Sequence, residues 1–397
     1  MKTIKDFDFK GKKAIVRVDF NVPLDGNFNI TDDSRIKAAI PTIEKILKDG
    51  GSVIVMSHMG RPKEGNKEKY SLRHIVKHLG KLLNREIKFA DDCIGDPAFE
   101  MAKSLTPGDV LLLENLRYYK EETKGDRDFA KKLASLGDVF VNDAFGAAHR
   151  AHASTTIIAE FFSKNKMFGN LFANELESIK KVISDIKRPY IAIIGGAKVS
   201  TKIDVLNNLI NKVDDIIIGG GMMFTFIKAQ GGKIGNSLVE DDYLETAREI
   251  LSYAKAKNVN IHLPADSVIA DDFSNDAKTK TCSSDQIPDG WIGMDIGEKA
   301  RQHFSSIIEN AKNVLWNGPM GVTEMSSFVA GTESIVKAMV KATKNGAFTL
   351  VGGGDSVSAI NQVGMADKVS YVSTGGGALL EYMEGKELPG VKAIMES

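Results

Sequence analysis

The sequence predicts an α/β protein of two lobes with mostly parallel sheets, joined by a central helix and hinge. Short apolar runs alternate with helical patterns along the whole chain, which is typical of βαβ units. The chain has 397 residues, the length of two domains of ordinary size. An amphipathic helical stripe near the middle separates two halves whose strand ends carry different residue types.

The candidate strands share an apolar run that ends in a polar or glycine-rich turn, at residues 14–18, 52–58, 110–115, 138–143, 190–196, 214–220, 313–318, 347–354 and 368–377. Helical patterns lie between them, at residues 34–48, 71–83, 126–135, 199–210, 241–256 and 329–343. Strands that alternate with helices pair in parallel, so both lobes are predicted to be Rossmann-like.

The first long strand has one polar face. In IVRVDFNVP, residues 15–23, apolar side chains alternate with Arg17, Asp19 and Asn21, and this alternation predicts a strand. A strand covered by helices on both faces is usually apolar throughout. The fold class alone therefore does not explain this polar face, and we expect it to have a function.

The middle of the chain predicts a helix between the lobes. Apolar residues from Phe172 to Ile186 recur at steps of four and three, which gives one helical stripe, and Pro189 ends it. We expect a first domain over 1–169, the helix over 170–187, a second domain over 188–380 and a C-terminal segment over 381–397. One more crossover helix in a single large sheet is the weaker alternative, given the length of the chain.

Four glycine-rich turns follow strands in the second half, at residues 195–196, 219–221, 352–354 and 375–377. Parallel strands end at one edge of a sheet, so these turns are expected to converge there. Glycines let a backbone approach a ligand, and the helix that follows each turn points N–H groups outward. The turns predict a phosphate-bearing ligand, although they match neither the P-loop nor the G-x-G-x-x-G spacing.

Charged residues accompany these turns. We expect Lys198 and Lys202 one helical turn apart at the start of a helix. A cation at that end of a helix is unfavourable with respect to the helix dipole, and it is tolerated best when an anion is bound there too. Asp355 follows the glycines of 352–354; it is either a simple helix cap or a ligand of Mg²⁺ beside a nucleotide phosphate.

The strand ends of the first half are basic instead. Several cations follow strands or begin a helix there: Arg17, Arg35, His58, Arg61, Arg117 and Arg150. In a chain with 52 Lys and Arg against 52 Asp and Glu, such a cluster predicts a focused anion pocket. Arginine suits phosphate and carboxylate because its planar fork donates hydrogen bonds in pairs.

Composition excludes other classes. The balanced charge argues against nucleic acid or an anionic membrane surface as a partner, and no run reaches the length of a membrane helix. Cys93 and Cys282 stand alone, and the N-terminus lacks an apolar signal region, so we expect a soluble cytoplasmic protein. Neither the pair His74 and His78 nor the pair His149 and His152 has the neighbouring Glu or the cysteine cluster that a zinc site would need.

Taken in order, RVDFNVP, DDSRIKAAIPT, SHMGRP, LENLRYY, AHRAHAST, GGAKVSTK, WNGPMGVTE, GGGDS and STGGGA closely resemble the motifs of phosphoglycerate kinase. The resemblance covers essentially the whole chain. It implies an enzyme, a phosphotransferase that acts reversibly between ATP, bound as its Mg²⁺ complex, and the carboxylate of 3-phosphoglycerate. It also implies that the C-terminal segment packs on the first domain. We expect a monomer, since nothing in the sequence demands more.

Matched motif by motif, the resemblance assigns the phosphoglycerate site to Asp19, Asn21, Arg35, His58, Arg61, Arg117 and Arg150. It assigns the nucleotide site to Gly196, Lys198, Lys202, Gly220, Gly293, Asn317, Glu324, Gly353, Gly354, Asp355 and Ser356, with Asp355 as the Mg²⁺ ligand. The catalytic groups implied are Arg35, Lys198, Gly354 and Gly376, which would meet the transferring group when the lobes close. Met59, Thr323 and Ser356 depart from the residues common in the family.

The resemblance also gives the polar face of residues 15–23 its reason. We expect it to open onto the substrate cleft, with Asp19 and Asn21 accepting hydrogen bonds from a substrate hydroxyl and Arg17 held to Asp19 by an ion pair. The nucleophile implied is a carboxylate, which is ionised near neutral pH and needs no general base. Catalysis would then rest on positioning and on cations around the transferring group.

Two other classes stay open from the residues alone. A non-catalytic bilobal protein could close on an anion, but the nucleotide-type turns count against it. A dinucleotide-dependent dehydrogenase lacks the acidic ribose ligand expected after the glycine turn.

Overall fold

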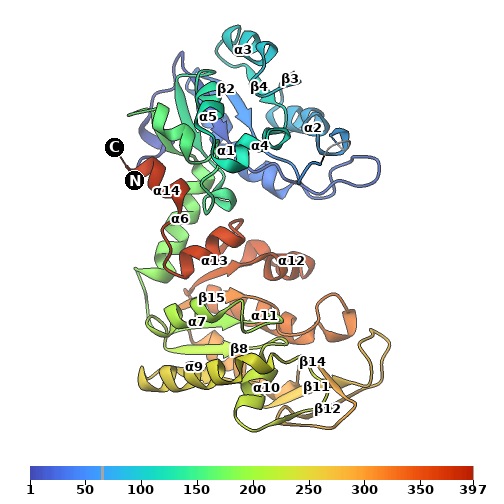
Figure 1. Cartoon of the computed structure of the whole chain (residues 1–397). Helices are drawn as coiled ribbons and strands as arrows, with labels where there is room; N and C mark the ends of the chain where they lie inside the picture. Colours follow the sequence, from blue (N-terminus) through green and yellow to red (C-terminus); the bar gives the residue numbers. More distant parts are fainter. Residues whose placement is uncertain (64–66, 397) are drawn as a thin grey trace. The chain divides into compact units, whose positions relative to one another are not determined.

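The computed structural model describes residues 1–63 and 67–396. The chain divides into two compact units (Figure 1): unit 1 comprises Met1–Leu176 and Glu387–Ser397, and unit 2 comprises Glu177–Lys386. The division falls within helix α6 (Asn170–Ile183), the helix that the central stripe predicts. Each unit is described by itself below.

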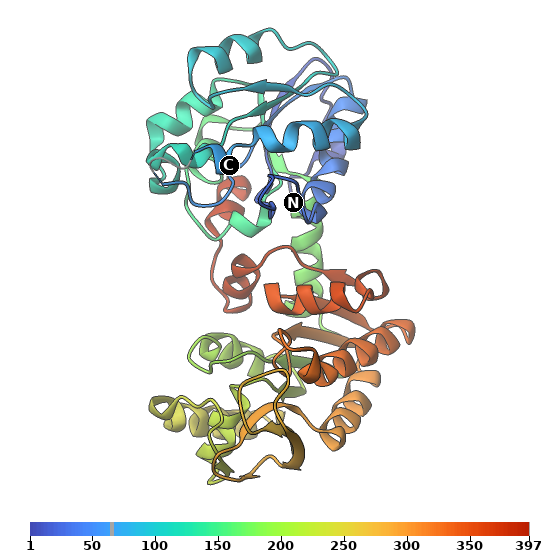
Figure 2. The same ribbon diagram turned by 90° about the vertical axis from the view of Figure 1, so that its right-hand side faces the viewer.

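Unit 1 is built on a parallel sheet in the order β3-β4-β2-β1-β5-β6. Its strands are β1 (Lys13–Arg17), β2 (Ser52–Met56), β3 (Lys88–Ala90), β4 (Val110–Leu113), β5 (Val139–Asn142) and β6 (Lys166–Phe168). Its helices are α1 (Ser34–Lys48), α2 (Arg73–Leu83), α3 (Asp96–Lys103), α4 (Lys120–Lys124), α5 (Arg127–Ala134) and α14 (Pro389–Met395). Helices cover both faces of this sheet (Figure 2).

Unit 2 is built on a second parallel sheet, in the order β10-β8-β7-β15-β16-β17. Its strands are β7 (Tyr190–Ile194), β8 (Asp215–Ile218), β10 (Asn260–His262), β15 (Asn313–Asn317), β16 (Phe348–Gly352) and β17 (Tyr371–Val372). Its helices are α7 (Ile203–Ile210), α8 (Met223–Ala229), α9 (Leu244–Ala256), α10 (Glu298–Glu309), α11 (Ala330–Lys344), α12 (Gly354–Gln362) and α13 (Gly377–Met383).

Two small sheets complete unit 2. The strands β11 (Asp266–Ala270), β12 (Thr279–Ser283) and β14 (Ile292–Ile296) are antiparallel, and β9 (Lys233–Ile234) pairs in parallel with β13 (Gln286–Ile287). The prediction of an α/β fold with mostly parallel sheets is confirmed. None of these five strands was expected: β9 and β13 have two residues each, β12 is mostly exposed, and β11 and β14 contain polar or glycine residues.

Apolar runs explain the central strands. All five residues of β2, β7 and β15 are buried, as expected for strands covered on both faces. Taken in chain order, the main strands of unit 2 run 3-2-1-4-5-6, so the direction of winding reverses between β7 and β15. Ligands of such sheets bind in the crevice at the carboxyl ends of the strands at this point.

Several predicted elements are shorter than expected, among them α6, which ends at Ile183 instead of 187, and two of the differences affect candidate site residues. Strand β1 ends at Arg17, so Asp19 and Asn21 lie beyond it rather than along a polar strand face. Helix α7 begins at Ile203, so Lys198 and Lys202 precede the helix instead of sharing its first turn. In both places a polar loop with regular spacing follows a strand, and the spacing alone does not show where the element ends.

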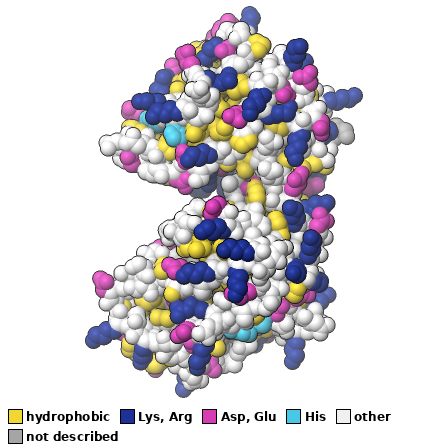
Figure 3. All heavy atoms as spheres, turned by 180° about the vertical axis from the view of Figure 1, so that it is seen from behind, with side chains coloured by type: hydrophobic (Ala, Val, Ile, Leu, Met, Phe, Trp, Pro, Cys, Tyr) yellow, Lys and Arg dark blue, Asp and Glu magenta, His cyan; other side chains and the backbone are white. Residues whose placement is uncertain are grey.

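The ends of the chain belong to unit 1. Helix α14 contacts β6 and a short 3₁₀ helix at Ile157–Phe161, and both ends of the chain lie on this unit in Figure 1. Both signs of charge are interspersed over the surface that Figure 3 shows. Within the described residues, no helix is long and apolar enough to cross a membrane.

Candidate functional sites

The carboxyl edge of the sheet in unit 1 collects polar side chains from several loops. Arg35, at the start of α1, donates through Nη1 to Oδ2 of Asp19 at 3.0 Å and to the carbonyl oxygen of Asn21 at 3.1 Å. The Asp19 side chain is largely buried, whereas that of Arg35 is 40% exposed. Asp19 therefore holds Arg35 in place while part of the guanidinium stays free to meet a solute.

The loop after β2 is hydrogen-bonded to Asn21 as well. The backbone N–H of Gly60 donates to Oδ1 of Asn21 at 2.7 Å, and Arg117 donates through Nη1 to the carbonyl oxygen of Gly60 at 2.8 Å. Asn115, which is fully buried, bonds both the N–H and the carbonyl of Met59 and accepts from the N–H of Arg117. One amide thus fixes two loops against each other.

Arg17 differs from its prediction. Its side chain is fully buried, and it donates to Oγ of Ser154 at 2.9 Å and to the carbonyl oxygen of Val18. The expected ion pair with Asp19 is wrong: Asp19 pairs with Arg35 instead. Arg17 is the last residue of β1, and its buried side chain is bonded to Ser154 instead of to Asp19.

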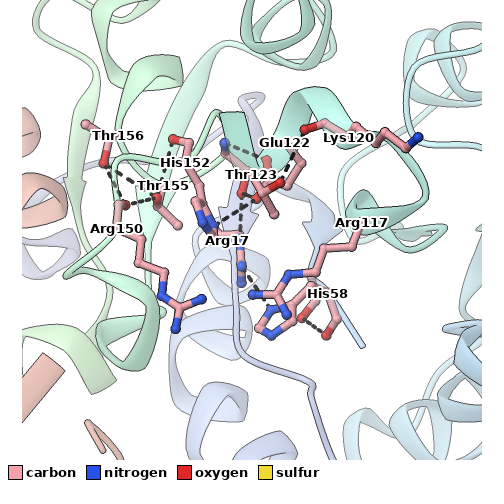
Figure 4. A network of polar contacts seen from close by, with 12 residues as sticks. Arg17, His58, Arg117, Lys120, Glu122, Thr123, Arg150, His152, Thr155 and Thr156 are labelled. Atoms are coloured by element: carbon pink, nitrogen blue, oxygen red, sulfur yellow. Dashed lines mark hydrogen bonds and ion pairs between the residues drawn. The ribbon is translucent and has the colours of Figure 1, made fainter. Parts of the chain in front are cut away.

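His58 receives a hydrogen bond from Arg17 (Figure 4). Nη2 of Arg17 lies 3.1 Å from Nδ1 of His58, and since a guanidinium can only donate, Nδ1 is the acceptor. Burial and the neighbouring Arg17 lower the pKa of His58 well below its usual value. The neutral ring therefore carries its proton on Nε2, where it can donate to an anion.

Arg117 and Arg150 lie on either side of Arg17 in Figure 4. Burial, and next the charge of Arg17, lower the pKa of Arg117 to about 10, and Arg150 adds to this shift. Nε of Arg117 is buried without a hydrogen-bond partner among the described residues. An unpaired buried donor is costly, and a bound anion would remove that cost.

The structure therefore brings together most of the predicted residues of this site: Asp19, Asn21, Arg35, His58, Arg117 and Arg150. Arg61 is exposed and directly follows Gly60 in the same loop. We call this group the acceptor pocket. Sequence reasoning missed its buried supports, Asn115, Glu122 and Ser154, because single polar residues next to strands carry no spacing signal.

Unit 2 contains a cavity of about 490 Å³ at the carboxyl edge of its sheet. Its walls are mainly glycine backbone and apolar side chains, among them Phe224, Leu238 and Met320. Glycine is required at Gly220, where φ is +65° and a Cβ would lie 2.5 Å from backbone atoms of Gly196. An apolar slot with a few polar groups suits a flat ring such as a nucleotide base.

The predicted nucleotide residues divide into two groups. Five of them line the cavity: Gly196, Gly220, Gly293, Glu324 and Asp355. The others are not among its walls: Lys198, Lys202, Asn317, Gly353, Gly354 and Ser356. Thr323 does not line it either. The apolar walls were missed because a base-binding surface has no charge or glycine pattern to mark it.

Part of the second group forms a polar cluster at the ends of β15 and β16. Lys202 donates to Oδ1 of Asn317, and Asn317 donates to the carbonyl oxygen of Gly352 at 2.9 Å. Oγ of Ser356 accepts from the N–H of Gly318 at 2.6 Å. Burial lowers the pKa of Lys202, and the charge of Asp355 opposes that shift, so Asp355 connects the cluster to the cavity.

Two predicted catalytic glycines border open space. A Cβ added at Gly354 or at Gly376 would meet no protein atom within 4 Å, apart from chain neighbours and its own helix. Gly376 also has a φ of +50°, which favours glycine on its own, whereas Gly354 has no such backbone requirement. Nothing in the protein's own packing therefore explains glycine at position 354.

The histidine pairs have local partners. His74 contacts the carbonyl oxygen of Glu68 at 2.8 Å, and His78 contacts Oδ2 of Asp33 at 2.9 Å. In residues 1–63 and 67–396, no three or more His, Cys, Asp or Glu side chains come together as a metal site. Asp355 would be a single carboxylate ligand, which suffices where phosphate oxygens supply the rest.

Comparison with known proteins gives one consistent result. The family model described as "Phosphoglycerate kinase" matches residues 4–386. The chain is 54% identical to a phosphoglycerate kinase of Porphyromonas gingivalis, with 99% of each chain covered. It is 52% identical to a cytosolic phosphoglycerate kinase of Nicotiana tabacum, over 99% of this chain and 97% of the relative.

Solved structures agree with these sequences. The phosphoglycerate kinase of Coxiella burnetii superposes with a TM-score of 0.90 at 38% identity, over 99% of this chain and 98% of that one. That of Pyrococcus horikoshii gives a TM-score of 0.85 at 30% identity, with the same coverage.

Proposed function

The chain belongs to the phosphoglycerate kinase family, and on this premise we propose how its residues transfer a phosphoryl group between ATP and the carboxylate of 3-phosphoglycerate. The acceptor pocket of unit 1 binds 3-phosphoglycerate, and the cavity of unit 2 binds the nucleotide. The observation that carries this assignment is the contrast between the two sites. One is an arginine cluster with an unpaired buried donor, and the other is an apolar slot bordered by glycine turns.

The acceptor pocket supplies charge without a general base. A carboxylate nucleophile is ionised near neutral pH, and its approach to an anionic phosphoryl group is opposed by repulsion. The guanidinium groups of Arg35, Arg117 and Arg150 offset that repulsion, and Nε2–H of His58 adds a donor. Asp19 and the side chain of Asn21 accept hydrogen bonds, which favours the hydroxyl end of the substrate over a second phosphate.

We assign Arg35 to the transferring group and Arg61 and Arg150 mainly to the substrate phosphate. Arg35→Ala should therefore lower kcat, by roughly a hundredfold for a lost transition-state contact, while Arg61→Ala should mainly raise KM for 3-phosphoglycerate. Steady-state kinetics of the two variants checks the division. A nearly normal kcat with a raised KM for Arg35→Ala would remove its catalytic assignment.

Asp355 is the proposed ligand of Mg²⁺ bound with the nucleotide. Its carboxylate lines the cavity at the start of α12, and the polar cluster of Lys202 and Asn317 lies beside it. The metal would neutralise phosphate charge. Asp355→Ala should abolish turnover while leaving 3-phosphoglycerate binding intact, as measured by calorimetry; undiminished turnover would rule out this role.

Lys198, Gly354 and Gly376 complete the proposed catalytic set. Backbone N–H groups at the starts of α12 and α13 can donate to phosphoryl oxygens, and the space beside Gly354 and Gly376 allows that approach. The hinge closure implied by the family resemblance stays a prediction, as do the domain boundaries at 169, 187 and 380.

A coupled assay separates this function from the alternatives. Dependence of ADP formation on both ATP and 3-phosphoglycerate supports the kinase. Tight anion binding without turnover would support a binding protein, and reduction of a nicotinamide cofactor would support a dehydrogenase. We further propose a cytoplasmic monomer, testable by cell fractionation and light scattering; relatives include cytosolic and chloroplastic proteins.

A further inference from the structure

Glu122 on α4 is a fully buried carboxylate beside the acceptor pocket. We propose that Glu122 is a positioning residue of this pocket: it clamps Ser154 and thereby holds Arg150 and, through the buried Arg17, His58 in their binding positions. The proposal rests on the function proposed above. It concerns a residue that touches no substrate-binding side chain directly and acts through its neighbours.

The clamp consists of hydrogen bonds between Glu122 and two consecutive residues. Oε1 of Glu122 accepts from Oγ–H of Ser154 at 2.6 Å, and Oε2 accepts from the backbone N–H of Ser154 at 3.0 Å. The carbonyl oxygen of Glu122 accepts from the N–H of Ala153 at 2.9 Å. A buried carboxylate must be well bonded to be tolerated, and these bonds fix the segment 153–154 to α4.

One arm of the clamp leads to Arg150. The carbonyl oxygen of Arg150 accepts from the N–H of His152 at 2.8 Å and from the hydroxyl groups of Thr155 at 3.1 Å and Thr156 at 3.3 Å. Its donors therefore flank Ser154 on both sides. The exposed Arg150 side chain donates through Nε to Nε2 of the adjacent His149 at 3.0 Å, so both residues that place it belong to this turn of backbone.

The other arm leads to Arg17 and His58. The hydroxyl of Ser154 accepts from Nε of Arg17 at 2.9 Å while donating to Glu122, so one oxygen joins the two buried charged groups. Burial lowers the pKa of Arg17, and the charge of Glu122 opposes this shift. Arg17 in turn donates to His58, which keeps Nε2–H of the ring available to the substrate.

His152 is not a competing partner of the carboxylate. Its Nδ1 lies 3.9 Å from Oε1 of Glu122, too far for a hydrogen bond. Burial and the charges of Arg117 and Arg17 lower the pKa of His152 to about 4. The ring is therefore neutral near pH 7, and this contact is no ion pair.

Unit 2 offers a matched control. There Glu240 accepts from the N–H of Ser200 at 3.0 Å and from its hydroxyl at 2.6 Å, which is the same two-bond arrangement. Ser200 lies between Lys198 and Lys202, two of the proposed nucleotide residues. Breaking this second clamp removes an equivalent pair of hydrogen bonds without touching the acceptor pocket.

The test compares Glu122→Gln with Glu240→Gln in steady-state kinetics. An amide has one acceptor oxygen for the two donors of the serine, so each clamp loses a bond. Glu122→Gln should raise KM for 3-phosphoglycerate about fivefold or more and leave KM for ATP within about twofold. Glu240→Gln should leave KM for 3-phosphoglycerate unchanged.

Ser154→Ala, which keeps the carboxylate, should raise KM for 3-phosphoglycerate as Glu122→Gln does. The double variant should have a KM no higher than that of either single variant.

A background variant tests the route through Arg150. In Arg150→Ala enzyme, Glu122→Gln should raise KM for 3-phosphoglycerate by a smaller factor than in the wild type. An equal factor in both backgrounds, equal rises of both KM values, or a lower Tm with unchanged KM values would overturn the positioning role. If Glu122→Gln fails to fold, Ser154→Ala carries the same comparison. A wild-type enzyme without turnover would instead refute the proposed function, whatever the variants do.

Discussion

His58 and His152 carry no charge near neutral pH, because burial and nearby arginines lower the pKa of both rings, that of His152 to about 4. The positive charge of the acceptor pocket therefore comes from arginines, whose charge is constant over the working range of pH. On the proposed function, 3-phosphoglycerate affinity should therefore not depend on the charge of His58 or His152 near neutral pH. The same shifts lower stability in acid, since the unfolded chain binds these protons first, from about pH 6.5 downward.

Gly354 gives the sharpest residue-scale prediction. A Cβ there meets no nearby protein atom, and the backbone needs no positive φ. Gly354→Ala should therefore leave Tm unchanged or slightly higher, because alanine favours helix over glycine. If phosphoryl oxygens approach this position, kcat should fall roughly tenfold or more. Thermal unfolding and steady-state kinetics measure the two effects.

Gly26 provides the control for that variant. It lies in an exposed loop of unit 1, a Cβ there also meets nothing within 4 Å, and its φ is not positive. Gly26→Ala should change neither Tm nor kcat. Equal kcat values for the Gly26→Ala and Gly354→Ala enzymes would mean that no ligand approaches Gly354 closely.

At the scale of elements, the start of α6 depends on one buried carboxyl group. Oδ1 of Asp143 accepts from the N–H of Phe172 at 3.1 Å, and Gly169 passes so close that a Cβ would lie 2.2 Å from the same oxygen. Burial raises the pKa of Asp143 to about 6, although its hydrogen bonds oppose the shift. The ionised form is therefore tolerated at a cost in the folded chain.

That cost has a defined pH dependence. A carboxyl group with a folded pKa above its unfolded value binds a proton on folding, so its destabilising effect is greatest above pH 6 and declines as pH falls towards 4. The free energy of unfolding of Asp143→Asn, minus that of the wild type, should be about 1 kcal/mol larger at pH 8 than at pH 5. Urea denaturation at both pH values measures it; a difference independent of pH would contradict the raised pKa.

Sequence patterns predicted the elements well where apolar runs are long. Strands β2, β7 and β15, together with helix α1, lie close to where periodicity places them. The patterns failed where tertiary contacts decide: β1 ends at Arg17 because the following residues bond to α1 and to the loop after β2. Family motifs located the charged side chains of both sites, whereas Phe224 and Leu238 of the cavity and the buried Glu122 follow from packing that no local pattern records.

At the scale of the whole molecule, two six-stranded parallel sheets with different strand orders carry side chains of different chemistry. In the proposed function each unit binds its substrate at the carboxyl edge of its parallel sheet, where the loops that follow neighbouring strands meet. In unit 1 those loops carry arginines, and in unit 2 they carry glycine turns and an apolar slot. The account therefore predicts that each substrate binds to its own unit, even when the other substrate is absent.

Hydrogen–deuterium exchange with single substrates tests that claim most directly. 3-Phosphoglycerate alone should slow exchange in the loops around residues 19–21, 58–60, 115–117 and 150–154 of unit 1. Mg²⁺ and ATP alone should slow exchange around residues 195–202, 219–224, 317–324 and 353–356 of unit 2. Protection of the same unit by both substrates, or protection of unit 2 by 3-phosphoglycerate alone, would contradict the assignment of the two sites.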